Sequence, residues 1–334
     1  MDRRDFIQSI APVAAAAALN QWHSKDDAAK QPAFLRTGDT IGIVATGGSI
    51  SREAVEPAVQ QLKAWGFAVK IGSTIGKQYN TFGGTDEERA RDLQRMLDDR
   101  EVKAILCARG GYGTVRIIDS LDFKQFRKHP KWIAGFSDVT VLHSHISRNF
   151  NIATIHCKMC NSFPGDPSAS DPVQRATIDS IRAALVGEPM VYSASINPSN
   201  RYGKASGRLV GGNLKILETL AATKSDLNCD GAILFIEDTN EYLYNIDRML
   251  VNLERTGKLR NLAGLLVGGF KIKPDDPGEE FNQALEQIVL SKVSSFNYPV
   301  GFNFPVGHQR ENYAVRCGLV HTMEVGVNGT RVEA

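Results

Sequence analysis

The sequence predicts an α/β protein whose first half is a parallel β-sheet covered by helices on both faces. Three observations indicate this. Short apolar runs alternate with helical patterns from residue 40 to residue 156. The runs are almost continuously hydrophobic, which is typical of strands buried on both faces. The helical patterns between them are long enough to return the chain to a parallel strand.

The expected elements of this first half follow one another closely. Ser51 is placed to cap the first helix, and the acidic residues after Thr85 lie in the first turn of another, where the helix dipole favours them. The expected strands cover residues 40–45, 67–71, 102–108, 132–136 and 152–156, and the helices cover 51–65, 85–97, 114–121 and 137–150. We assign residues 36–165 to one N-terminal domain.

A stretch rich in Pro, Gly, Ser and Asp (residues 161–171) marks the end of that domain. We assign residues 166–204 to a crossover helix over 173–185 and a polar linker over 189–204. The α/β alternation then resumes, and residues 205–334 form a second domain. Its expected strands are 207–210, 231–236, 262–267, 300–304 and one or two within 313–327, and its helices are 213–222, 244–254 and 281–293.

Composition excludes several function classes. The 334 residues are 42% hydrophobic and 23% charged, with a net charge of +2, as in an ordinary soluble protein. No basic cluster is long enough to bind nucleic acid, so no nucleic-acid partner is expected. No apolar run is long enough to span a membrane, so we expect no integral membrane segment in the mature chain.

The N-terminus resembles a targeting sequence. Arg3 and Arg4 precede Phe6 and a small-residue run that ends near Ala18. This pattern favours a twin-arginine (Tat) export signal, so residues 1–35 are interpreted as signal and linker. The alternative is a cytoplasmic N-terminal helix. The first interpretation predicts a periplasmic or otherwise exported protein, and the second a cytoplasmic one.

The most informative motif follows the strand over 102–108. Gly110, Gly111 and Gly113 surround a sharp turn, and Thr114 begins the next helix. Strand, glycine turn, hydroxyl residue and helix are the layout of a nucleophile elbow, in which helix N–H groups can hold a developing oxyanion. Two alternatives remain open: Thr114 is a plain N-cap, or the glycine loop merely binds an anion.

An acid and a histidine complete a possible triad. Glu237 ends the strand over 231–236, and His308 follows the strand over 300–304. Ligands collect beyond the carboxyl ends of such strands, and the order hydroxyl, acid, histidine is that of α/β-hydrolases. A histidine activates a hydroxyl, and a carboxylate orients the histidine. Alternatively, Glu237 is a surface acid with Asp238 as its competitor, and His308 is a loop histidine.

Five cysteines argue against a complete disulfide framework. Cys157 and Cys160 form a C-x-x-C, but no second pair accompanies them and only His156 is nearby. We favour a structural interpretation over a redox pair or half a metal site, and we expect no metal and no cofactor.

Five segments, taken together, resemble the LD-carboxypeptidase family (peptidase family S66), which includes murein tetrapeptide carboxypeptidases and microcin-immunity peptidases. They are ARGGYGTVRIID (108–119), WIAGFSDVTVLH (132–143), LVGGNLKILETLAAT (209–223), ILFIEDTNEYLYNIDRML (233–250) and GFNFPVGHQREN (301–312). The resemblance implies a flavodoxin- or Rossmann-like N-terminal domain with the nucleophile. It also implies a C-terminal α/β domain of swivelling β-barrel type with the acid and the histidine.

The resemblance also implies a serine-type peptidase with a Ser-Glu-His triad that acts as a homodimer and removes terminal D-alanine from murein tetrapeptides. On this chain the roles fall on Thr114, Glu237 and His308. The N–H of Val115 is the expected oxyanion donor, with a second donor from Gly84. Threonine keeps the hydroxyl, but its methyl restricts χ1. The alternative is therefore an impaired homologue that binds cell-wall peptides without turnover.

Overall fold

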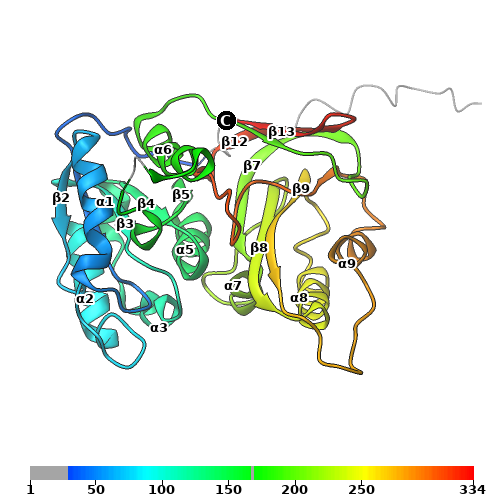
Figure 1. Ribbon diagram of the computed structural model, residues 1–334, viewed down its shortest axis with the longest axis horizontal. Coiled ribbons are helices and arrows are strands. Elements are labelled where there is room, and N and C mark those ends of the chain that lie inside the picture. Colours follow the sequence, from blue (N-terminus) through cyan, green and yellow to red (C-terminus); the bar gives the residue numbers. More distant parts are fainter. Residues whose placement is uncertain (1–28, 167–168) are drawn as a thin grey trace, which may run out of the picture.

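A computed structural model of the chain describes residues 29–166 and 169–334 (Figure 1). The predicted export signal, except for its last residues, lies outside the described residues. Two β-sheets form the centres of the two halves of the molecule, with helices packed on them (Figure 1). No helix in the described ranges is long and apolar enough to cross a membrane.

The first sheet has six strands in the order β11-β5-β4-β3-β1-β2. Its strands are β1 (Thr40–Val44), β2 (Ala68–Ile71), β3 (Val102–Cys107), β4 (Trp132–Gly135), β5 (Thr154–His156) and β11 (Val315–Cys317). The first five are mutually parallel where they pair, as predicted. The sixth, β11, pairs antiparallel with β5. A segment near the C-terminus therefore completes the N-terminal sheet, which sequence periodicity did not indicate.

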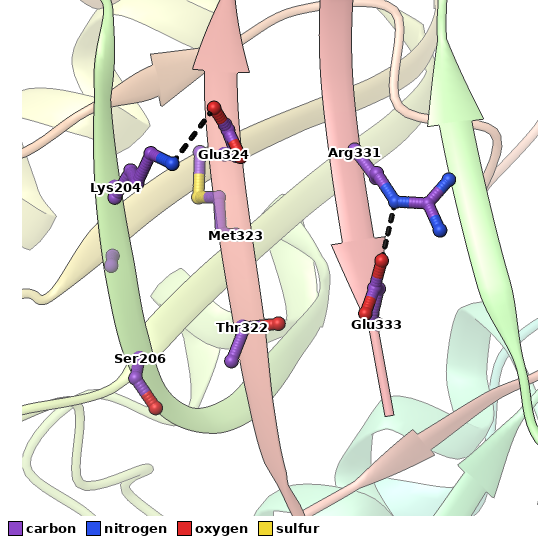
Figure 2. A pocket seen from close by; sticks show the side chains of 8 residues that line it. Lys204, Ser206, Thr322, Met323, Glu324, Arg331 and Glu333 are labelled. Carbon is purple, nitrogen blue, oxygen red and sulfur yellow. Dashed lines mark hydrogen bonds and ion pairs between the residues drawn. The ribbon is translucent and has the colours of Figure 1, made fainter.

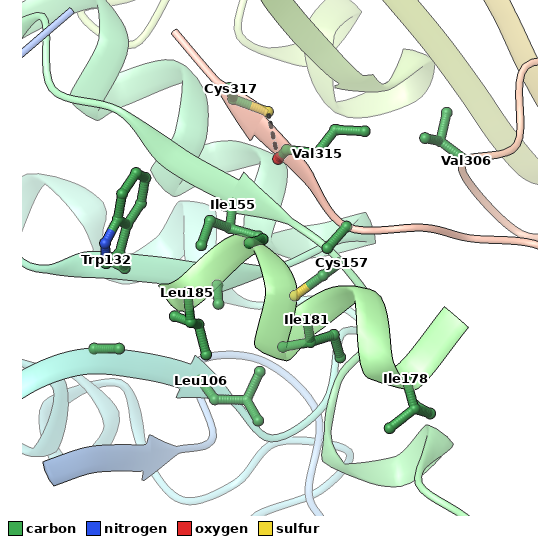
Figure 3. Packing of buried hydrophobic residues seen from close by; sticks show 14 of the residues in the cluster. Leu106, Trp132, Ile155, Cys157, Ile178, Ile181, Leu185, Val306, Val315 and Cys317 are labelled. Carbon is green, nitrogen blue, oxygen red and sulfur yellow. Dashed lines mark hydrogen bonds between the residues drawn. The ribbon is translucent and has the colours of Figure 1, made fainter. Parts of the chain in front are cut away.

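Helices cover both faces of this sheet. They are α1 (Arg52–Ala64), α2 (Asp86–Asp98), α3 (Thr114–Ile117), α4 (Lys124–Lys128), α5 (Thr140–Phe150) and α6 (Pro172–Val186). Apolar residues of α1 and α6 share one core with one face of the strands, while those of α2 and α5 share another core with the opposite face. Figure 3 shows Ile178, Ile181 and Leu185 of α6 against the residues of the sheet.

The second sheet has seven strands in the order β10-β9-β8-β7-β12-β13-β6. Its strands are β6 (Val191–Ala194), β7 (Gly203–Asn213), β8 (Ile233–Glu241), β9 (Gly264–Ile272), β10 (Val300–Gly301), β12 (Val320–Gly326) and β13 (Gly329–Glu333). The β7-β8-β9-β10 part is parallel, and the rest is antiparallel. Its helices are α7 (Leu214–Thr219), α8 (Leu243–Arg255) and α9 (Leu285–Lys292). Their apolar residues form a separate core with the parallel part.

Three expectations need correction. The predicted polar linker over 189–204 contains β6, whose exposed Val191 and buried Tyr192 alternate as on a half-covered strand. The helix expected over 114–121 ends at Ile117 and continues as a 3-10 turn. The strand β13, which pairs with β12 through a tight hairpin, was not predicted.

All five cysteines are buried and unbonded to one another. Burial raises the pKa of the Cys107 thiol to about 12, so a reactive thiolate is disfavoured there. Within the described ranges no group of three His, Cys, Asp or Glu side chains could hold a metal ion. The buried position of Cys157 and Cys160 fits the structural interpretation.

Candidate active site

The carboxyl ends of β1, β3 and β4 carry three loops that meet at one edge of the first sheet. The loop after β1 contains Gly47 and Gly48, and the loop after β3 contains Gly110. The N–H of Gly48 donates a hydrogen bond to the carbonyl of Gly110 at 2.8 Å. This is the edge at which ligands bind in open parallel sheets.

Glu237 and His308 lie in direct contact beside these loops. Glu237 belongs to β8 and is fully buried, and His308 follows the turn after β10 with 17% of its side chain exposed. The Nδ1 atom of His308 lies 2.6 Å from Oε2 of Glu237. Because Nδ1 donates to this carboxylate, the other ring nitrogen, Nε2, is left as an acceptor. The structure thus brings together two residues that are 71 positions apart.

Gly307 makes the contact between this histidine and the acid possible. Its φ of +100° lies in the region that favours glycine, and a Cβ there would stand 2.4 Å from the Cβ of Glu237. The carboxamide of Asn312 accepts a hydrogen bond from the N–H of Gly307 at 2.8 Å and one from Nε2 of His156 at 3.2 Å. These bonds join the His308 loop to the end of β5.

Thr114 does not occupy the position of a nucleophile. Thr114 is fully buried, and its hydroxyl donates a hydrogen bond to Oδ2 of Asp138 at 2.6 Å. The backbone N–H of Thr114 donates to the same oxygen at 2.9 Å, and the hydroxyl of Thr46 is a further neighbour at 2.9 Å. Among the described residues, no hydrogen bond between Thr114 and His308 is found. The predicted assignment of Thr114 as nucleophile is therefore corrected, because a carbonyl cannot approach an oxygen enclosed in this way.

The bonds around Thr114 instead fix the glycine loop. Burial raises the pKa of the Asp138 carboxyl, and the hydrogen bonds from Thr114 oppose that shift. The fully buried guanidinium of Arg89 donates to the carbonyl of Gly113 at 2.9 Å and also to the carbonyl of Thr46. Buried polar groups that are hydrogen-bonded in this way stabilise one loop conformation.

Ser137 is a second hydroxyl residue close to these loops. It lies in the turn between β4 and α5, is partly exposed and has a φ of +61°. Seven described non-glycine residues have positive φ, and five of them are asparagines, which tolerate it. A serine in this conformation at a strand-to-helix turn is the geometry of a nucleophile elbow.

The surroundings of Ser137 fit this interpretation. A Cβ built on Gly110 would lie 3.1 Å from the Cβ and 3.3 Å from the Oγ of Ser137, so the glycine loop approaches the hydroxyl closely. The ring of Phe136, the preceding residue, lies 4.9 Å from the ring of His308 between centroids. The sequence pattern placed Ser137 only at the start of the helix expected over 137–150, and its side chain caps no helix. The Gly-x-Ser that follows the buried strand 132–135 was the available signal.

The predicted oxyanion donors Val115 and Gly84 lie near the starts of α3 and α2. Val115 is in the first turn of α3, behind Thr114. Gly84 precedes the capped start of α2 and is packed against the side chain of Glu88. Gly111 is exposed on the glycine loop. No contact of Val115 or Gly84 with Ser137, Glu237 or His308 is found among the described residues.

A separate hollow of about 430 Å³ shares none of its lining residues with this site. It is lined by strands β7, β12 and β13 (Figure 2). Its charged side chains pair with one another, Lys204 with Glu324 at 3.1 Å and Arg331 with Glu333. Because these charges are exposed and already paired, the hollow presents an ordinary solvated sheet face.

Comparison with known proteins identifies the family. The family model described as the LD-carboxypeptidase N-terminal domain matches residues 41–157, and that of the C-terminal domain matches residues 206–323. The chain is 36% identical over 306 residues to a "Probable murein peptide carboxypeptidase" of Bacillus subtilis, covering 91% of this chain and 94% of that protein. It is 27% identical to the "Murein tetrapeptide carboxypeptidase" of Pseudomonas aeruginosa, covering 85% and 92%.

Solved structures agree with the fold. A muramoyltetrapeptide carboxypeptidase from Oxalobacter formigenes superposes with a TM-score of 0.77 at 27% identity, over 88% of this chain and 98% of that one. An MccF-like protein from Bacillus anthracis superposes with a TM-score of 0.78 at 22% identity, over 91% and 99%, which supports the fold alone. From the family models and the Bacillus subtilis relative, the chain belongs to the LD-carboxypeptidase family of peptidases.

Proposed function

We propose that this protein is a serine-type carboxypeptidase that removes the terminal D-alanine from murein tetrapeptides, with Ser137 as nucleophile. One observation carries the proposal: Ser137 has a positive φ in a strand-to-helix turn, and the residue before it, Phe136, packs against the histidine of the Glu237–His308 pair. The substrate class rests on the family and on the names of the relatives. If Ser137 is the nucleophile, as proposed, the threonine at position 114 gives no reason to expect an impaired enzyme.

The proposed reaction uses each group for a different step. Nε2 of His308 takes the proton of the Ser137 hydroxyl as Oγ attacks the scissile carbonyl. Glu237 holds the ring through Nδ1 and stabilises the imidazolium that forms. The imidazolium then protonates the leaving amino group, D-alanine departs, and water, activated by the same histidine, hydrolyses the ester on Ser137. The structure records no Ser137–His308 hydrogen bond, and such bonds often tighten only in the substrate complex.

The tetrahedral oxyanion needs two backbone donors. We propose the N–H of Asp138, the residue after the nucleophile, and an N–H of the Gly110–Gly111 turn. The close approach of Gly110 to Ser137 supports the second donor. The side chain of Asp138 is hydrogen-bonded to Thr114. This bond holds the backbone of Asp138 next to the glycine loop.

Location and assembly follow as parts of the proposal. The twin arginine at Arg3 and Arg4 supports an exported enzyme that works on peptides near the cell wall. A homodimer is expected from the family resemblance. Cell fractionation of wild type against an Arg3→Lys/Arg4→Lys variant tests the first expectation, and sedimentation of the purified chain tests the second.

The decisive experiment measures D-alanine release from murein tetrapeptide by mass spectrometry. Ser137→Ala is expected to lower kcat by about 10⁴-fold or more, the usual effect of removing a nucleophile of this kind. Thr114→Ser is expected to stay near wild type, since it keeps the buried hydroxyl. Ser147→Ala on α5 is the matched control. Full activity of Ser137→Ala, or no release by wild type, would overturn the proposal.

A further inference from the structure

Lys158 is a positively charged side chain beside the proposed catalytic groups that the mechanism above does not use. It follows β5 and is partly buried. Its Nζ lies 5.5 Å from the centre of the Phe136 ring, the same ring that lies against His308. Its Nζ donates a hydrogen bond to the backbone carbonyl of Gln309 at 3.0 Å. Lys158 and His308 therefore both flank the residue that precedes Ser137.

In the part of the chain that the structure describes, no carboxylate pairs directly with this ammonium group. Lys158 forms no ion pair among residues 29–166 and 169–334. The acids that interact with it over a longer range are Glu237, already bonded to His308, and Glu311, while Lys271 adds a like charge. Burial lowers the pKa of Lys158, and Lys271 adds to that shift.

A cation in such a place is suited to bind an anion. An ammonium group has three N–H donors, and the bond to Gln309 uses one of them. A partly desolvated positive charge without a partner is costly, and an incoming carboxylate offsets that cost through a charge-assisted hydrogen bond. Exposed and paired lysines, such as Lys204 opposite Glu324, offer no such gain.

A carboxypeptidase requires an anion-binding group close to its catalytic residues. The terminal carboxylate of its substrate belongs to the residue just after the scissile bond, and one residue spans at most about 3.6 Å. The group that recognises the carboxylate must therefore lie close to the nucleophile and its base. Lys158 meets that condition through its contact with Phe136.

We propose that Lys158 binds the terminal carboxylate of the peptide substrate and thereby restricts the enzyme to the last residue of a free chain. This inference rests on the proposed function, and it adds a specificity residue to it. A purely structural role, in which Lys158 only anchors Gln309, is the rival explanation.

A binding experiment separates the two explanations without requiring turnover. Calorimetry in the Ser137→Ala background compares a murein tetrapeptide with a free C-terminus and the same peptide as its C-terminal amide. We expect the free acid to bind on the order of 30-fold more tightly than the amide. Adding Lys158→Met should abolish that ratio by weakening only the acid, and adding Lys158→Arg should retain most of it. Lys271→Met, which removes a nearby exposed charge, is the matched control and should change the ratio less than 3-fold.

Turnover by the otherwise unchanged enzyme provides the second measurement. Lys158→Met should raise KM for the acid while leaving cleavage of the amide within about 3-fold. Equal losses on both peptides would show a structural role and overturn the proposal, as would an acid-to-amide binding ratio near one in the Ser137→Ala background. If the wild type cleaves neither peptide, the proposed function fails, whereas the binding ratio still decides the role of Lys158.

Discussion

Thr114→Val tests directly whether Thr114 is a structural or a reacting residue. The substitution replaces a hydroxyl by a methyl of nearly the same size, so it creates no cavity in a fully buried position. It removes the 2.6 Å bond to Asp138 and the contact with the Thr46 hydroxyl. A hydrogen bond to a charged group contributes about 1.5–3 kcal/mol, and Asp138 keeps its bond from the Thr114 backbone. We expect a loss of about 2 kcal/mol in the free energy of unfolding.

That loss is measurable by thermal unfolding. With about 2 cal/mol/K of unfolding entropy per residue, a 334-residue chain loses about 3 °C in Tm for 2 kcal/mol. D-alanine release at a temperature well below Tm should persist, reduced by the looser glycine loop but far above that of Ser137→Ala. An unchanged Tm together with complete loss of turnover, or a covalent acyl group found on Thr114 of the wild type, would refute the reasoning.

Two further predictions concern the glycine loop and the buried histidines. Gly110→Ala should lower kcat roughly 10- to 100-fold with little change in Tm, because the new Cβ would crowd Ser137 at 3.1 Å. Burial lowers the pKa of His143 and His321 to about 4 and that of His156 well below its ordinary value. The unfolded chain then binds more protons between about pH 4 and 6.5. The free energy of unfolding therefore decreases as the pH is lowered through this range, by up to about 1.4 kcal/mol per pH unit for each histidine. Urea midpoints that are equal at pH 7 and 4.5 would contradict this.

Hydrophobic periodicity was sufficient to predict most of the fold. Where strands are buried on both faces and helices are amphipathic, the pattern specifies the element almost to its ends, as for β3 and α2. It fails for β6 and β13, which are short and in part exposed, and it does not place β11 in the first sheet. Their pairing is determined by partners far away in the sequence, such as Val315 opposite His156, and local propensity carries no information about such partners.

Local sequence pattern also predicted only part of the candidate site. Glu237 and His308 were predicted because each follows a buried strand, and the structure places them in contact. The choice between Thr114 and Ser137 could not be made in this way. Both are hydroxyl residues in glycine-containing turns after neighbouring strands, and both begin helical segments. Backbone conformation and burial separate them. Ser137 has a φ of +61° and is partly exposed, whereas Thr114 is helical and fully buried.

The two hydroxyl residues are nevertheless linked, and the link explains why Thr114 stands in so nucleophile-like a motif. Asp138 directly follows Ser137, and its side chain accepts both the N–H and the hydroxyl of Thr114. The glycine loop is thereby tied to the elbow, with Gly110 against Ser137. The hydroxyl at position 114 helps to hold the glycine loop against the turn that carries Ser137, whether or not it reacts. A nucleophile-like motif can therefore mark the loop that faces the nucleophile, and the residue with the strained backbone is the better guide to the reacting oxygen.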